Sequence, residues 1–353
     1  MTQCGGPTRD HKVLVNAFRS TLYTPEELLG GFRSDDVTSY ASTLDFEVYR
    51  GFIATGRMER ATYAEAIIQS LHDNSISFAM RNFLDDKPAA AIMGGNRMPR
   101  SAPHYADVAR IARTLTRKGI LVCSGGGPGA MEATHLGAAM ATQPDSALDS
   151  AIALLATVPD LPDMQNVVDC DGNINEKLLT ILHEWSRPAF EIWEQMENPG
   201  ESLAIPTWHY GHEPPTPFAT HIAKYFQNSL REDGLLAIAT QGIIYTDGRA
   251  GTLQEVFQDA AQNYYRSYRW FSPMVFFGSK IWQDDFPVIP VLEKLFEKKD
   301  FSSLVLVTDN CEEAAKFVMG FVPPEDKPES ARPPSPELQA RRGLAMEPRT
   351  GLK

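Results

Sequence analysis

Short apolar runs alternate with amphipathic stretches over the central and C-terminal parts of the chain. Runs of four or five apolar residues that end at glycine or at polar residues are typical of buried parallel strands. Apolar positions spaced three and four apart are typical of helices, as with Val108, Ile111, Ala112 and Leu115 ahead of the capping Gly119. Both kinds of element therefore occur, and they alternate.

The predicted strands lie at 89–93, 120–123, 152–158, 203–205, 242–246, 274–277 and 304–307. The predicted helices lie at 105–118, 130–141, 218–236, 252–265, 288–297 and 311–319. This βαβα order implies a parallel sheet with helices on both faces, which is a Rossmann-like, doubly wound α/β fold.

The two ends of the chain differ from this central part. Residues 1–85 carry helical patterning, with a helix start at Thr24, Pro25 and Glu27 and further helices at 61–71 and 76–84. We expect this extension to be a packing or dimerisation layer. Residues 321–353 contain seven prolines and few aliphatic residues, which predicts a flexible tail. The chain thus divides into an extension at 1–85, a Rossmann-like nucleotide-binding domain at 86–320 and a tail at 321–353.

The stretch from Ile120 to Ala133, ILVCSGGGPGAMEA, combines a strand, a glycine-rich turn and a helix start. This arrangement presents bare backbone N–H groups to a phosphate at the positive end of a helix. Glycine permits the close approach and the positive φ that such a loop requires. A tight turn that binds nothing is the alternative interpretation, although four glycines in five residues exceed what a simple turn needs.

The composition is that of a soluble globular protein, with 43% hydrophobic and 22% charged residues. The net charge of -12 and the pI of about 5.2 argue against a surface that binds nucleic acid, because phosphate backbones require a basic footprint. A local basic pocket for one small phosphate is compatible with that charge.

Cysteine usage and hydropathy indicate the compartment. Cys4, Cys123, Cys170 and Cys311 lie far apart and form no C-x-x-C pair, so we expect neither a disulfide framework nor a zinc site. No apolar run approaches transmembrane length, and the N-terminus lacks the apolar core of a signal peptide. We therefore expect a cytoplasmic protein that contacts no membrane.

Three loops follow predicted strands and carry residues suited to a phosphate: 94–97, 124–129 and 247–252. Because ligands of a doubly wound sheet bind beyond the carboxyl ends of its strands, these loops are expected to cradle a nucleoside monophosphate. NAD is disfavoured, since GGGPG lacks the G-x-G-x-x-G pattern and Asp145, about 20 residues on, falls in a predicted loop. An NTP hydrolase is disfavoured because no Gly-Lys-Ser/Thr follows the glycines.

The segment that begins at Thr252 allows two interpretations. Thr252 and Glu255 have the spacing of a capping box, which by itself explains both residues. Alternatively, Glu255 faces the same cleft as the glycine loops, where a carboxylate stabilises an oxocarbenium ion or positions water, as in glycoside cleavage. Composition alone favours the cap.

Two motifs resemble those of the Lonely Guy (LOG) family. Residues 124–133, SGGGPGAMEA, and 247–255, DGRAGTLQE, are similar to its GGGxxGxM loop and its P-G-G-x-G-T-x-x-E motif, and the resemblance extends over about 89–320. It implies a Rossmann-like, usually dimeric phosphoribohydrolase that cleaves a nucleoside 5′-monophosphate to free base and ribose 5-phosphate, without metal or cofactor. A longer bacterial branch of the family acts on ordinary purine and pyrimidine monophosphates.

The resemblance assigns roles by position. Glu255 matches the catalytic glutamate, and Arg231 is the candidate for the catalytic arginine, although its spacing differs by one residue and a surface arginine paired with a neighbouring acid is the alternative. The candidate substrate- and phosphate-binding residues are Gly94, Gly95, Asn96, Gly126, Gly127, Gly129, Met131, Glu132, Gly248, Arg249, Gly251 and Thr252.

Two departures from the motif keep a second function open. Asp247 stands where the family has proline and adds negative charge beside the expected phosphate, whereas Arg249 replaces a glycine and offers a compensating cation. The alternative function is a non-catalytic nucleotide-binding sensor with the same fold. A pyridoxal-phosphate decarboxylase is excluded by the absence of a lysine at a predicted strand end.

The segment 207–217, TWHYGHEPPTP, is foreign to the short LOG proteins. His209 and His212 have the spacing of metal ligands but lack a third ligand, so a rigid, proline-bounded loop over the cleft is the favoured interpretation. Tyr210, His212 and Glu213 are candidates for reading the base.

Overall fold

A computed structural model describes residues 15–57, 61–85, 87–265, 267, 271–297 and 302–323. Its centre is a seven-stranded, all-parallel sheet in the order β4-β3-β2-β1-β5-β6-β7. The strands are β1 Ala89–Met93, β2 Leu121–Ser124, β3 Ser202–Ala204, β4 His221–Ile222, β5 Gly242–Tyr245, β6 Met274–Phe277 and β7 Val305–Thr308. The predicted Rossmann-like α/β class is confirmed.

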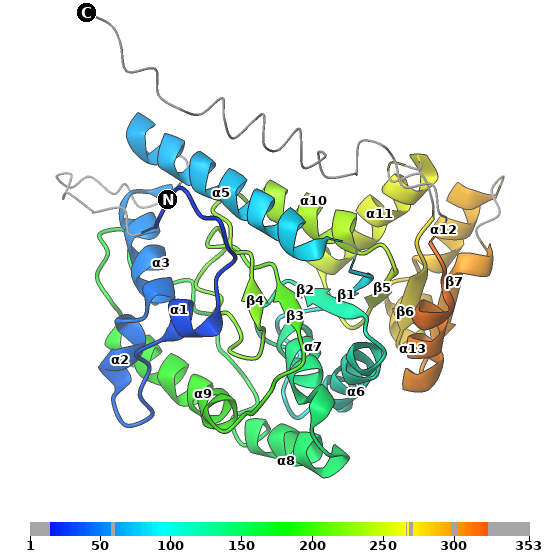
Figure 1. Cartoon of the computed structure of the whole chain (residues 1–353), viewed down its shortest axis with the longest axis horizontal. Helices are drawn as coiled ribbons and strands as arrows, with labels where there is room; N and C mark the ends of the chain where they lie inside the picture. Colours follow the sequence, from blue (N-terminus) through cyan, green and yellow to red (C-terminus); the bar gives the residue numbers. More distant parts are fainter. Residues whose placement is uncertain are drawn as a thin grey trace, which may run out of the picture.

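Helices cover both faces of this sheet (Figure 1). The α-helices of the described residues are α1 Pro25–Leu29, α2 Val37–Ala41, α3 Leu44–Ala54, α5 Tyr63–Leu84, α6 Pro103–Arg117, α7 Ala130–Ala139, α8 Asp145–Leu155, α9 Glu176–Glu194, α10 Asn228–Ile238, α11 Ala250–Tyr265, α12 Ile289–Phe296 and α13 Cys311–Gly320. Gly119, with φ of 80°, follows the end of α6 as predicted.

The side chains of β1 alternate between the two faces of the sheet. Ala90 and Ile92 join a core with α6, α7 and α13, whereas Ala89, Ala91 and Met93 join a second core with α5, α10 and α11. Figure 1 shows the same arrangement, with α5, α10 and α11 above the strands and α6, α7 and α13 below them. A strand buried on both faces must be apolar throughout, which explains its uninterrupted run of alanine, isoleucine and methionine.

Two predicted elements are wrong. The apolar run at 152–158 was expected to be a strand, but residues 145–155 form α8, whose buried Leu148, Ala151 and Leu155 are spaced three and four apart. The expected helix at 218–236 is instead strand β4 followed by α10. Phe218 to Phe226 run mostly buried at the β4 edge of the sheet, so this segment lacks the exposed face that an amphipathic surface helix requires.

The N-terminal extension is helical as expected, with Thr24 accepting a hydrogen bond from the Glu27 backbone at the start of α1. The two helices expected between 61 and 84 form the single helix α5, which begins at a capping box made by Thr62 and Glu65. Helix α9 was not predicted. The predicted flexible tail at 321–353 lies almost wholly outside the described residues.

A buried polar network joins the extension to the segment that follows β3. Asp45 of α3 accepts hydrogen bonds from Lys224 Nζ at 2.5 Å and from Trp208 Nε1 at 2.9 Å. The side chains of Asp45 and Lys224 are each only 1% exposed. Asp73 of α5 accepts from the backbone N–H of Phe226 at 3.0 Å. The extension thus shares its interior with the sheet domain.

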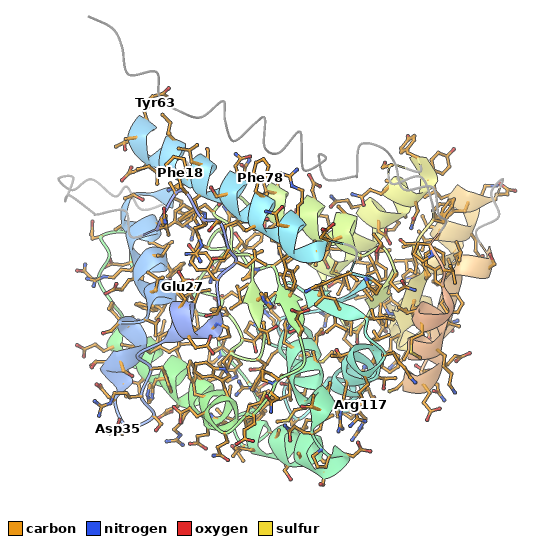
Figure 2. The ribbon with its side chains drawn as sticks, viewed as in Figure 1. Phe18, Glu27, Asp35, Tyr63, Phe78 and Arg117 are labelled. Carbon is orange, nitrogen blue, oxygen red and sulfur yellow. The ribbon has the colours of Figure 1, made fainter. Side chains whose placement is uncertain are left out.

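The outer side of α5 carries large exposed side chains. Tyr63 and Phe78 are 84% and 56% exposed, and Figure 2 shows both on the side of α5 away from the sheet. Ile67 and Leu71 are also exposed and lie one turn apart between them. The expected homodimer stays a prediction.

Within the described residues, none of the helices combines the length and apolarity needed to cross a bilayer. Cys123 and Cys311 are free thiols, whereas Cys170 is disulfide-bonded, a bond that the spacing of the cysteines did not predict. No described group of three or more histidine, cysteine or acidic side chains is arranged to hold a metal ion.

We predict that Asp45→Asn lowers the free energy of unfolding by about 3–5 kcal/mol, because it leaves the Lys224 ammonium buried without its counter-charge. Urea denaturation measures the change. Glu297→Gln, which breaks the exposed pair between Lys294 and Glu297, is the control and leaves stability almost unchanged. A similar small effect of both substitutions would contradict the prediction.

Candidate functional site

A cleft of about 820 Å³ opens at the carboxyl ends of the strands, where the chain path reverses between β1 and β5. Strands β1 to β4 follow one another outward in one direction, and β5 to β7 continue in the other. The connections that leave β1 and β5 therefore diverge, which is where ligands of open α/β sheets bind. Residues 94–99 after β1, 247–252 after β5, and side chains after β3 and β6 line the cleft.

The predicted loops are brought into contact by backbone hydrogen bonds. The N–H of Gly95 donates to the carbonyl of Asp247 at 2.6 Å, and the N–H of Ala130 donates to the carbonyl of Gly95 at 3.2 Å. A Cβ at Gly94 would lie 2.4 Å from Cγ2 of Thr246. Glycine at that position is therefore needed for the close approach of the two loops.

Arg231 and Glu255 face each other in this cleft. Arg231 Nη1 lies 3.5 Å from Glu255 Oε1, and both side chains are 12% exposed. The Nε of Arg231 donates to the carbonyl of Ile205 at 3.0 Å, which holds the guanidinium beside the end of β3. Arg231 is thus not a surface arginine.

Burial raises the pKa of Glu255 to about 7, while Arg231 opposes the shift and the charges of Glu232 and Glu213 add to it. A carboxyl group with a pKa near neutrality, next to an arginine in a cleft, has the properties of an acid–base or charge-stabilising group.

The capping-box interpretation of Thr252 is wrong. Helix α11 begins at Ala250, so Thr252 lies in its first turn instead of preceding it. Its buried side chain packs on Gly248, where a Cβ would lie 2.0 Å from Oγ1 of Thr252. The absence of a side chain at Gly248 lets the loop fold closely onto the start of α11.

The glycine-rich loop after β2 is buried throughout. Gly125 lies beneath Arg231, since a Cβ there would be 2.1 Å from Nη2. Gly126 accepts a hydrogen bond from the backbone of Thr216 at 2.9 Å, and the side chain of Glu213 lies over Gly127. The segment that follows β3 therefore covers most of this loop.

The predicted binding residues separate into two groups. Those that line the cleft are Gly94, Gly95, Asn96, Met131, Gly248, Arg249, Gly251 and Thr252, and those that do not are Gly126, Gly127, Gly129 and Glu132. Glu132 is 1% exposed and accepts hydrogen bonds from Arg100 at 2.6 and 2.8 Å and from Tyr105 at 2.9 Å. Its partners give it a structural role within the domain.

The candidates for reading the base also separate. Tyr210 and Glu213 line the cleft, and Asn96 Nδ2 donates to Glu213 Oε1 at 3.0 Å. His212 points the other way, with Nε2 2.9 Å from the hydroxyl of Tyr40 and with Tyr49 and Phe46 around its ring. Burial lowers the pKa of His212 well below its usual range. Its position behind the loop excludes contact with a ligand in the cleft.

Sequence reasoning missed one part of the site, the pair formed by His104 and Asp247. His104 Nδ1 lies 2.9 Å from Asp247 Oδ1, and this hydrogen bond raises the pKa of His104. No local motif marks His104, because the contact forms only when the start of α6 meets the loop after β5. Arg97, the last residue of the predicted loop 94–97, lines the cleft, and among the described residues neither Arg97 nor Arg249 forms an ion pair with a carboxylate.

Comparisons with known proteins identify no family for this chain. No protein-family model matches the chain, and no curated protein sequence is detectably similar. The crystal structure of TM1055, a Northeast Structural Genomics Consortium target, aligns with 66% of this chain and 99% of that chain, at 17% identity and a TM-score of 0.38. The fold class follows from the order and the parallel pairing of the seven strands.

We predict that Arg231→Gln raises the pKa of Glu255 further, because it removes the positive charge that favours the ionised form. NMR titration of ¹³C-labelled glutamate carboxyl groups measures the shift. Arg97→Gln, which removes a cation from the same cleft without a direct contact to Glu255, is the control and should produce a smaller shift. A pKa of Glu255 that falls or stays the same in Arg231→Gln would contradict the assigned pairing.

Proposed function

We propose that this protein hydrolyses the N-glycosidic bond of a nucleoside 5′-monophosphate and releases free base and ribose 5-phosphate. The observation that carries the proposal is the pairing of Arg231 with the desolvated Glu255 at the reversal point of the sheet. Both residues are the ones that the resemblance to LOG phosphoribohydrolases selects as catalytic. Arg231 and Glu255 are 24 positions apart on two different helices, so it is the fold that brings them together. This proximity supports the resemblance.

The phosphate is assigned to the start of α11. The loop 247–252 exposes backbone N–H groups at the positive end of a 16-residue helix, and Arg249 is an exposed cation beside them. Arg249 lies 5.8 Å from the centre of the Phe286 ring, which leaves its guanidinium without a competing carboxylate among the described residues. The buried glycines after β2 then shape the floor under Arg231 instead of holding the phosphate.

Glu255 and Arg231 supply the chemistry. As the bond between C1′ and the base nitrogen breaks, its electron pair leaves with the base and positive charge develops on the ribosyl ring. The ionised Glu255 stabilises that charge and accepts a proton from the water that adds to C1′, and the departing base takes up a proton from solvent, so that one water is consumed in total. Arg231 orients the sugar phosphate and favours the ionised form of Glu255 by lowering its pKa.

Asp247 differs from the proline of the motif, and its negative charge disfavours phosphate binding. Its contacts partly offset that charge. Its carboxylate pairs with His104, so the added negative charge has a partner 2.9 Å away. Its backbone carbonyl holds Gly95. A loop with this aspartate therefore keeps a geometry that can bind phosphate.

The alternative function is a nucleotide-binding sensor without catalysis. One contact favours it: the Glu213 side chain lies over Gly127, where the family resemblance leads one to expect room for the ligand. A ligand then binds the remaining cleft without the geometry needed for hydrolysis.

Incubation with a panel of nucleoside 5′-monophosphates distinguishes the two functions. We expect free base and ribose 5-phosphate from the parent protein and a loss of at least about 100-fold in kcat for Glu255→Gln, because the charge that stabilises the transition state is removed. Chromatography of the base and an enzymatic assay of the sugar phosphate measure both products. Binding detected by thermal shift without any product would instead support the sensor.

The pH dependence follows from the pKa of Glu255. Its raised pKa means that the catalytic ionised form is lost as the pH falls through about 7, so kcat/KM should decrease about tenfold per pH unit below that value and level off above it. Asp259 also has a pKa raised to about 7 by burial, with its hydrogen bond from Tyr245 opposing the shift. Asp259→Asn should therefore retain the acid limb, and disappearance of the limb in that variant would contradict the assignment to Glu255.

A further inference from the structure

Glu213 is an acid of the cleft that the proposed reaction does not use. It lies in the segment after β3, and its carboxylate accepts a hydrogen bond from Asn96 Nδ2 at 3.0 Å. Its side chain rests on Gly127, where a Cβ would lie 2.7 Å from Cδ of Glu213. A hydrogen bond on one side and a glycine floor on the other hold this carboxylate in one place on the wall of the cleft.

The contacts of Glu213 locate its carboxylate over the loops after β1 and β2, because Asn96 follows β1 and Gly127 follows β2. Along the edge of the sheet, the loop after β5 comes first, the loops after β1 and β2 follow, and the segment after β3 comes last. The phosphate is assigned to the first of these, and the bond that breaks must lie next to Glu255 and Arg231. The base then extends toward β3, where Thr207, Tyr210 and Glu213 line the cleft.

We infer that Glu213 is a specificity-determining residue that selects a guanine base through its Watson–Crick edge. This inference rests on the proposed function and names its substrate class. A carboxylate offers two acceptor oxygens and no donor when ionised. Guanine presents two adjacent donors, N1–H and the N2 amino group, and matches both oxygens.

Other bases match a carboxylate less well. Adenine and cytosine each offer one amino group next to a ring nitrogen that is an acceptor, and that nitrogen faces the second oxygen unfavourably. Uracil presents a single N–H between two carbonyl groups. Hypoxanthine keeps N1–H but lacks the N2 amino group, so it retains one of the two hydrogen bonds.

The test compares GMP, IMP, AMP and CMP in the parent and in Glu213→Gln. We expect the parent to favour GMP over AMP by about 10- to 100-fold in kcat/KM, the range typical of one bidentate contact. In Glu213→Gln the advantage of GMP over both AMP and IMP should collapse to within about threefold. Circular dichroism melting of both proteins establishes that the variant is folded.

Glu232→Gln is the matched control. Like Glu213, Glu232 adds negative charge that raises the pKa of Glu255, but its carboxylate does not line the cleft and accepts hydrogen bonds from Asn228, from Gln254 and, at 3.5 Å, from the hydroxyl of Tyr210. This variant should keep the preference for GMP. Loss of the preference in both variants would reveal a general charge effect and overturn the inference.

The possible outcomes distinguish a failure of the role proposed for Glu213 from a failure of the proposed hydrolase function. Cleavage of several nucleotides with no preference for GMP, or with a preference for CMP, overturns the role of Glu213 and leaves the hydrolase standing. If no nucleotide is cleaved, the proposed reaction fails, and calorimetric binding of GMP and AMP decides the role of Glu213 separately. Tighter binding of GMP that is lost in Glu213→Gln supports the inference, and equal binding overturns it.

Discussion

The reversal of the chain path between β1 and β5 is the constraint on which the rest of the site depends. Because these neighbouring parallel strands send their connections to opposite sides, the loops at 94–99 and 247–252 diverge and leave a cleft between them. The hydrogen bond from Gly95 to Asp247 joins the two loops at the base of that cleft. Glycine at both 94 and 248 is what lets the backbones approach so closely.

The N-terminal extension contributes to the cleft from behind. Asp45 and Tyr40 hold Trp208 and His212, which lie in the same short segment as Tyr210 and Glu213. Within this segment Trp208 and His212 face the extension, whereas Tyr210 and Glu213 line the cleft. The helices of the extension therefore hold in place the side of the cleft against which we propose that the base binds. Removal of one charge from the buried pair of Asp45 and Lys224 would destabilise that side of the cleft.

The charges in the cleft are arranged in compensating contacts. Glu255 faces Arg231, Asp247 faces His104, and Glu213 accepts a hydrogen bond from Asn96, whereas Arg97 and Arg249 have no carboxylate partner among the described residues. Asp285 also lines the cleft, and under the proposed function Arg97 and Arg249 are the cations available to a phosphate there. The net charge of -12 describes the whole chain and does not determine the charge of a pocket of this size.

The sequence alone determined the class of the fold and the positions of most elements, because buried strands and amphipathic helices impose local periods of hydrophobicity. It also placed the three loops at strand ends and Glu255 on the helix that follows one of them. Where burial was decided by distant neighbours, local reasoning failed: residues 152–158 continue a helix, and 218–236 begin with an edge strand. Only the tertiary structure paired Arg231 with Glu255, turned His212 away, buried Glu132 against Arg100 and brought His104 to Asp247. Each of these contacts joins residues that are far apart along the chain, and no local pattern encodes such a distance.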